Sequence, residues 1–202
     1  MDKGDTILTY LPAIIPSLKR KPHVTEDEAK QIWMAAKKHH TYLLIKTLWF
    51  TGLRISEAVN LVASSLDSSG NQYSLWVQTG KKRKNKKHPE RALKPDKLPI
   101  PEELGMELAR YITNAKLKPR DRLFLASRST YWRQIRNCAE KAGIPQWQDI
   151  HPHSFRHGFV YYKAQKGVHP YVLSKLARHE DLRTTLGYYE PTEADLRQAM
   201  EL

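Results

Sequence analysis

The chain has 202 residues, of which 40% are hydrophobic, and its 34 lysines and arginines outnumber 21 acidic residues to give a formal net charge of +13. This composition supports a globular fold, argues against global disorder and favours a polyanionic partner, above all nucleic acid. The single cysteine, Cys138, excludes an intramolecular disulfide, and no apolar run reaches the roughly 20 residues of a membrane span. The first residues also lack the pattern of a signal peptide, so we expect an intracellular protein without membrane contact.

The N-terminal third is predicted to be helical. Residues 1–22 contain prolines without a regular pattern and are expected to form a lead-in or linker. Thr25 and Glu28 then have the spacing of a capping box, which predicts the start of a helix. Apolar residues follow at the helical positions i, i+3, i+4 and i+7: Ala29, Ile32, Trp33 and Ala36. TYLLIKTLWF is apolar nearly all round and predicts a buried helix ending at Gly52, and we expect a further helix in SEAVNLVASS.

The middle of the chain changes character. NQYSLWVQTG alternates aromatic and β-branched residues and predicts a strand, with LPIP as a short returning strand. Between them, residues 81–94 carry eight lysines and arginines against one glutamate. Such a run is by default a solvated loop, but in so basic a protein we expect it to lie along a phosphate backbone.

Helical spacing resumes downstream. Helices are expected in PEELGMELARYITN, STYWRQIRNCAEKAG, HSFRHGFVYYKAQKG, PYVLSKLARH and TEADLRQAMEL, the last beginning at Thr192. Pro170 suits the first position of its helix, and Cys138 shares its apolar spacing with Ile135 and Ala139, as expected of a small buried residue. The predicted fold class is mainly α with a small antiparallel β-sheet (α+β).

HPHSFRHG, residues 151–158, gathers three histidines and an arginine near a helix start. His153 and His157 are four residues apart and would suit zinc, but the HExxH pattern and nearby cysteines are absent. With Arg156 they instead present two imidazoles and a guanidinium on one helix face, a pattern that favours phosphate. A buried histidine satisfied by backbone remains an alternative for His157.

Two further stretches are ambiguous by themselves. Arg54, at a helix start in TGLRISEAVNL, is well placed for an anion, with Glu57 to support it or cap the helix, but an ordinary solvated arginine fits equally well. In LARHEDLRTTLGYYEP, His179 precedes Tyr188 by nine residues, and Tyr189 follows directly. Packing is the usual role of such tyrosines.

Together and in this order, TGLRISEAVNL, Gly80-Lys81 after a strand, HSFRH and LARHEDLRTTLGYY resemble the catalytic domain of the tyrosine recombinase (phage integrase) family. The resemblance runs from about residue 22 to the end of the chain. It implies the following catalytic residues, with Tyr188 as the nucleophile: Arg54, Glu57, Lys81, His153, Arg156, His179 and Tyr188.

The same resemblance implies a chemistry. Such an enzyme cleaves and rejoins double-stranded DNA through a 3′-phosphotyrosyl intermediate, without metal, cofactor or ATP, in integration, excision or resolution of mobile DNA. Arg54 and Arg156 would offset the phosphate charge, and His153 is our candidate for proton transfer at the tyrosine. Lys81 matches the lysine that protonates the leaving oxygen, with Lys84, Lys86 and Lys87 as competitors. The basic loop would contact DNA through Lys82, Arg83, Lys84, Lys86, Lys87 and Arg91.

Domain and partner expectations follow from the family. Residues 23–202 would form the catalytic domain, including a C-terminal helix at about 192–202, and the N-terminal core-binding domain would be absent. The helix would join protomers into a multimer on DNA through Leu196, Ala199 and Met200, and an accessory DNA-binding protein could assist. We expect a cytoplasmic, DNA-associated protein of prokaryotic or viral type. The alternatives are a non-cleaving DNA-binding module of the same fold and a DNA-relaxing enzyme like type IB topoisomerases.

Overall fold

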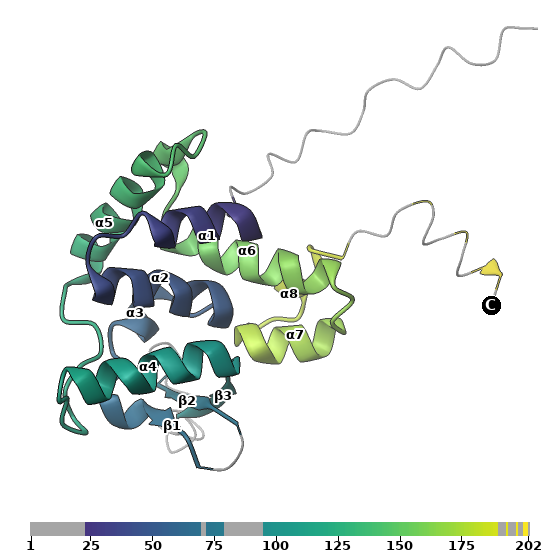
Figure 1. Ribbon diagram of the computed structural model, residues 1–202. Coiled ribbons are helices and arrows are strands. Elements are labelled where there is room, and N and C mark those ends of the chain that lie inside the picture. The colour runs from purple at the N-terminus through teal and green to yellow at the C-terminus, as the bar shows by residue number, and fades with distance from the viewer. Residues whose placement is uncertain are drawn as a thin grey trace, which may run out of the picture.

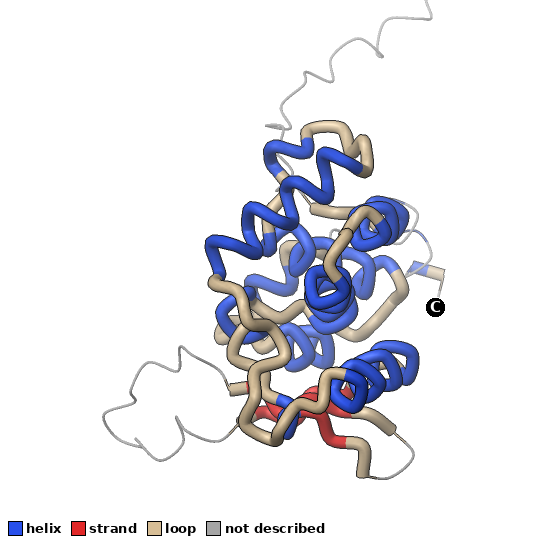
Figure 2. Tube along the Cα trace, turned by 60° about the vertical axis from the view of Figure 1, so that its left-hand side comes forward, coloured by secondary structure: helices blue, strands red, loops and turns tan. Residues whose placement is uncertain are grey.

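The computed structural model describes residues 23–69, 72–78, 95–189, 193, 197, 200 and 201. Over these residues the chain is mainly helical with one small antiparallel sheet at an edge of the molecule, which confirms the predicted fold class (Figures 1 and 2). Its helices are α1 (Glu26–Met34), α2 (His39–Thr51), α3 (Ile55–Ala58), α4 (Glu102–Asn114), α5 (Arg128–Lys141), α6 (Pro152–Gln165), α7 (Pro170–Ala177) and α8 (Arg183–Leu186), with the 3-10 turns η1 (Ala63–Ser65) and η3 (Trp147–Asp149).

The central helix α2 packs against α1, α4, α5 and α6, so its nearly all-apolar sequence is explained by contacts on every side. It ends as predicted at Gly52, which adopts the left-handed conformation with φ 59°. A Cβ atom there would lie 2.5 Å from the Phe159 ring. The predicted capping box is also confirmed, because the Thr25 hydroxyl accepts from Glu28 N and the Glu28 carboxylate accepts from Thr25 N at 2.8 Å.

The helix predicted in SEAVNLVASS is wrong in length. The helix α3 ends at Ala58, and the backbone then pairs with a distant segment, where Leu123 N donates to Leu61 O at 3.0 Å and Ala63 N donates to Asp121 O at 2.9 Å. These long-range partners satisfy backbone groups that a longer helix would have satisfied internally.

The sheet has the order β1-β2-β3, with β1 (Leu66–Asp67), β2 (Ser74–Val77) and β3 (Asp96–Pro99) all antiparallel. The strands β2 and β3 confirm the predicted pair, whereas β1, with two residues, is too short to show an alternating pattern. Helix α4 covers the sheet, and Gly105 provides the space for Tyr73, since a Cβ atom at Gly105 would lie 2.1 Å from that ring. The basic loop predicted at residues 81–94 lies outside the described residues.

One charged side chain is buried inside the helical layer. Lys46 of α2 donates to Glu103 Oε1 at 2.5 Å and to Glu107 Oε1 at 2.8 Å, and its ammonium group also lies 5.4–5.8 Å from the centres of three aromatic rings. These contacts compensate for the loss of hydration and fix α2 against α4, which carries both carboxylates.

The C-terminal half follows the predicted helices closely. Helix α7 has Pro170 at its first position, and Cys138 of α5 is buried beside Ile135 and Ala139. The C-terminal helix predicted at about 192–202 lies largely outside the described residues, and the exposed Met200 is one of the few described there. No helix in the described part of the chain is long and apolar enough to cross a membrane.

Helix α6 approaches the first described residues at a glycine, which gives a test of the packing. A Cβ atom on Gly158 would lie 2.2 Å from the carbonyl oxygen of Val24 and 2.8 Å from the Trp49 ring. We expect Gly158→Ala to lower the free energy of unfolding by about 1–3 kcal/mol, because the carbonyl oxygen of Val24 belongs to the backbone and cannot easily move to relieve the clash. Gly187→Ala is the matched control, since φ there is −63° and no atom lies within 4 Å of the added carbon. Urea unfolding measures both variants, and equal destabilisation would contradict the packing argument.

Candidate active site

Three segments that are far apart in the sequence meet near the end of α2 at Gly52: the start of α3, the first half of α6, and the chain from the end of α7 through α8. They bring together six of the residues predicted from the sequence: Arg54, Glu57, His153, Arg156, His179 and Tyr188. The other predicted residues lie outside the described part of the chain, so their roles stay predictions: Lys81, Lys82, Arg83, Lys84, Lys86, Lys87 and Arg91.

Arg54 and Glu57 form a close pair at the start of α3. The Arg54 backbone N–H donates to Glu57 Oε2 at 2.8 Å, and its guanidinium Nη1 donates to Oε1 at 3.0 Å. Glu57 therefore caps the helix and also supports the arginine. The Glu57 side chain is only 2% exposed, whereas that of Arg54 is 32% exposed, so the guanidinium extends from a buried anchor toward solvent.

Sequence reasoning missed a second arginine on the same carboxylate. Arg178 Nη2 donates to Glu57 Oε2 at 3.1 Å, and the Arg178 side chain is 6% exposed. Burial alone would raise the pKa of Glu57, but the charges of Arg178 and then Arg54 lower it below its ordinary value. Arg178 follows the last residue of α7 in the left-handed conformation, with φ 55°. Its only sequence signal was its place next to His179.

Arg156 is buried and anchored to the ends of two helices. Its Nη1 donates to the carbonyl of Gly52 at 2.6 Å, and its Nη2 donates to the carbonyl of Ala177. Burial, followed by the charges of Arg54 and Arg178, lowers the pKa of Arg156 to about 10, so the guanidinium stays charged at neutral pH. Arg54 and Arg178 therefore form ion pairs with Glu57, whereas Arg156 donates to backbone carbonyls, and the positive charge gathered here suits a bound phosphate.

Two histidines of the site have pKa values below the ordinary value of histidine. His179 Nδ1 lies 2.7 Å from the buried Thr185 hydroxyl, and burial together with Arg156 and Arg54 lowers the pKa of His179 to about 4. His153 lies at the exposed edge of the site, where partial burial and then the charges of His151 and Arg156 lower its pKa. A neutral imidazole can donate one hydrogen bond and accept another.

The structure separates the two neighbouring tyrosines. The Tyr188 hydroxyl is hydrogen-bonded to His157 Nδ1, whereas the Tyr189 hydroxyl donates to the backbone carbonyl of Val168. Burial raises the pKa of Tyr188, and the charge of Arg156 acts in the opposite direction. Both tyrosines pack against the small apolar cluster around Phe159, and Tyr188 is the one of the two whose pKa responds to the charge of Arg156. The contact at Nδ1 gives His157 a side-chain partner in addition to the backbone partner considered for that histidine.

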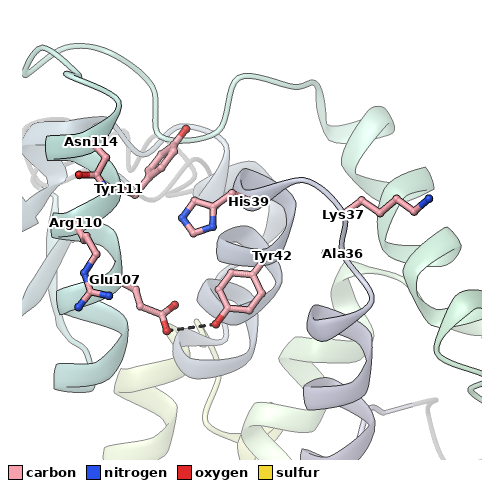
Figure 3. Close-up of a pocket in the computed structure, with 8 residues that line it drawn as sticks. All are labelled: Ala36, Lys37, His39, Tyr42, Glu107, Arg110, Tyr111 and Asn114. Carbon is pink, nitrogen blue, oxygen red and sulfur yellow. Dashed lines mark hydrogen bonds between the residues drawn. The ribbon is translucent and has the colours of Figure 1, made fainter.

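No group of three or more histidine, cysteine or acidic side chains among the described residues is arranged to hold a metal ion. Two grooves lie elsewhere. One of about 470 Å³ opens between the start of α2 and the second half of α4, where His39 and Tyr111 face each other across it (Figure 3). The other, of about 500 Å³, lies beside Phe50 and Phe159. Neither is lined by a predicted site residue, so the candidate site is a charged surface at helix ends.

Comparisons with known proteins all match this chain to tyrosine recombinases and phage integrases. A family model described as the phage integrase family matches residues 22–195. A tyrosine recombinase from Pseudothermotoga lettingae is 32% identical over 164 residues, which are 79% of this chain and 52% of the relative. Tyrosine recombinase XerA from Pyrococcus horikoshii is 30% identical over 198 residues, which are 94% of this chain and 63% of the relative. The chain therefore spans about half to two thirds of the length of these relatives.

Solved structures share the fold. The crystal structure of XerA recombinase aligns with a TM-score of 0.67 and 26% identity, covering 89% of this chain and 62% of the other. The catalytic domain of bacteriophage HP1 integrase aligns with a TM-score of 0.61 and 20% identity, covering 89% of this chain and 94% of the other. The second match shows the fold alone.

The buried Glu57–Arg178 pair predicts a stability effect. Arg178→Gln leaves Glu57 with Arg54 alone, and we expect the free energy of unfolding at pH 7 to fall by about 3 kcal/mol. Arg197→Gln is the control, because Arg197 and Glu193 form an ion pair with side chains 77% and 78% exposed, and its loss should cost less than about 0.5 kcal/mol. Similar losses in both variants, measured by urea unfolding, would contradict the assignment.

The pH dependence of this difference gives a second check. Because the folded-state pKa of Glu57 is lowered, its stabilising charge is present above the unfolded value of about 4.3 and is lost as the pH falls through the folded value. The difference in free energy of unfolding between wild type and Arg178→Gln should therefore become smaller at acid pH. A gap that is constant with pH would assign the loss to packing.

Proposed function

The chain belongs to the phage integrase family, as its four motifs predicted, and from that premise we propose that it cuts and rejoins double-stranded DNA as a site-specific recombinase. In the proposed reaction Tyr188 attacks a phosphodiester and forms a 3′-phosphotyrosyl link to the broken strand. The bond energy is kept in this link, so rejoining needs no ATP. Integration, excision or resolution of mobile DNA are the roles we propose for it.

The observation that carries the proposal is the arginine cluster beside the Tyr188 hydroxyl. Arg54 and Arg178 form ion pairs with Glu57, and after burial their charges lower the pKa of Arg156. The charges of Arg156 and Tyr188 in turn affect each other's pKa. The non-bridging oxygens of a phosphodiester gain negative charge in the transition state. Guanidiniums fixed before the reaction stabilise that charge without reorganising, and Arg54 extends into solvent where a DNA strand can reach it.

The charge of the whole chain supports a DNA partner. The formal net charge is +13, and the relatives that cover most of this chain are named tyrosine recombinases. Each phosphate that a lysine or arginine neutralises releases counterions, so binding of this kind weakens as salt rises. We assign the phosphate backbone to the basic segment at residues 81–94, with Lys81 as the proposed acid for the leaving 5′-oxygen.

A covalent-trap assay tests the nucleophile. Wild type, Tyr188→Phe and Tyr189→Phe are incubated in EDTA with supercoiled plasmid and with sheared genomic DNA of the source organism, then quenched in detergent. We expect a protein–DNA adduct with wild type and Tyr189→Phe and none with Tyr188→Phe. Tyr189→Phe removes only the hydrogen bond to Val168 and should cost about 1 kcal/mol of stability.

Each contrary result has a meaning. An adduct that persists in Tyr188→Phe and disappears in Tyr189→Phe would move the nucleophile by one residue. Salt-sensitive DNA binding without any adduct would replace the proposed reaction with a non-cleaving binding module. Plasmid relaxation without preference for any trapped fragment would favour a topoisomerase-like enzyme. Cleavage without an adduct that occurs with Mg²⁺ and is abolished in EDTA would point to a metal-dependent nuclease.

We also propose that the C-terminal segment joins protomers on DNA. The Met200 side chain is 87% exposed, and an apolar side chain in that position is available to a neighbouring copy. Deleting residues 192–202 should weaken multimer formation on a trapped DNA fragment more than single-site binding, as measured by gel shift. Equal loss of both complexes would show that the segment serves its own domain.

A further inference from the structure

We propose that His157 accepts the proton of the Tyr188 hydroxyl during strand cleavage and returns it during rejoining. This role rests on the proposed function, and it adds His157 to the catalytic residues expected from the motifs. From the sequence, His157 shared a helix face with His153 and Arg156 that favours phosphate, with a buried histidine satisfied by backbone as the alternative, and it was not among the implied catalytic residues.

The contact is direct. His157 lies on α6, one residue after Arg156, and its Nδ1 is hydrogen-bonded to the Tyr188 hydroxyl from the turn after α8. The two rings are nearly parallel, with centroids 6.2 Å apart and an interplanar angle of 28°. The nitrogen therefore touches the oxygen that attacks phosphorus, and the proton can pass in one step. An accepting Nδ1 requires that neutral His157 carry its ring proton on Nε2.

The other histidines of the site are engaged differently. His179 Nδ1 contacts the Thr185 hydroxyl, and with a pKa of about 4 this imidazole is a weak base at pH 7. The His153 ring lies at the exposed edge of the site, 6.1 Å from the ring of His151. Among the hydrogen bonds of the described residues, the Tyr188 hydroxyl meets the ring of His157 and not that of His153. His153 is then left to contact the phosphate.

The proton and bond changes balance. The Tyr188 Oη–phosphorus bond forms as the phosphorus–O5′ bond breaks, the phenol proton passes to His157 Nδ1, and an acid protonates the leaving 5′-oxygen. In rejoining, a 5′-hydroxyl attacks phosphorus, the Tyr188 oxygen leaves, and the His157 imidazolium protonates it. The same residue therefore acts as base in one direction and acid in the other, so its loss should slow both.

The test uses a DNA fragment trapped by the wild type, resynthesised with sulfur in place of the bridging 5′-oxygen at the cleaved bond. A thiolate leaves without an acid, so this substrate separates the two proton transfers. We expect His157→Gln to slow adduct formation by about 10²–10⁴-fold on the ordinary fragment and to remain slow on the sulfur fragment. Rejoining of a preformed adduct should slow as well. His39→Gln, at the far end of α2, is the matched control and should react like wild type.

A second variant separates proton transfer from positioning. His157→Ala leaves space beside Tyr188, and added imidazole should restore adduct formation, which a purely structural role would not allow. Thermal unfolding and gel shift on the same fragment check that both variants fold and bind DNA.

Three outcomes would overturn the proposal: cleavage by His157→Gln within threefold of wild type, recovery on the sulfur fragment, or failure of imidazole to restore a folded, DNA-binding His157→Ala. Absence of any wild-type adduct would instead refute the proposed function, and the role of His157 would fall with it.

Discussion

The buried carboxylate of Glu57 is the interaction on which the site depends. Arg54 and Arg178 both donate to this carboxylate. Arg156 is buried nearby, and the charges of Arg54, Arg178 and Glu57 all affect the pKa of Arg156. Without this carboxylate, three guanidiniums at the end of one helical layer would repel one another at low dielectric. With it, two can be held nearly desolvated, and the cluster still carries more positive than negative charge. This excess of positive charge would attract an anionic ligand.

The cluster is rigid because helix ends hold it. Arg156 binds the last carbonyl groups of α2 and α7, and Gly52 can present its carbonyl because it adopts a left-handed conformation beside the Phe159 ring. The helix α2 is fixed in turn by contacts on every side and by buried Lys46. Charge stabilisation at a transition state depends on such prior order, because donors that must move first lose much of their advantage. The core thereby helps to hold the arginine cluster in place.

Most of the helices could be predicted because their signals are local, whereas six residues of the site were predicted only from the resemblance of four motifs taken together and in order. Thr25 with Glu28 marks a helix start, Gly52 marks a helix end, and Arg54 with Glu57 shares one turn. The features that the sequence did not predict depend on contacts between residues far apart in the chain. The helix α3 stops early because residues 61–63 pair with 121–123, and Arg178 acquires its importance from a carboxylate 121 positions away. No window of sequence contains those contacts, so spacing alone left Arg178 without a role.

The positive cluster also bears on when the site can react. Burial lowers the pKa of His179 and His153, and the same arginines that would hold a phosphate lower it further, which disfavours protonated imidazole. Burial raises the pKa of Tyr188, but the charge of Arg156 lowers it and so reduces the cost of forming a phenolate. A phosphodiester placed between the arginines brings a negative charge that offsets their field, and histidines nearby then accept protons more readily. Binding of DNA would in this way strengthen a neighbouring imidazole as a base at the moment when the Tyr188 hydroxyl faces phosphorus.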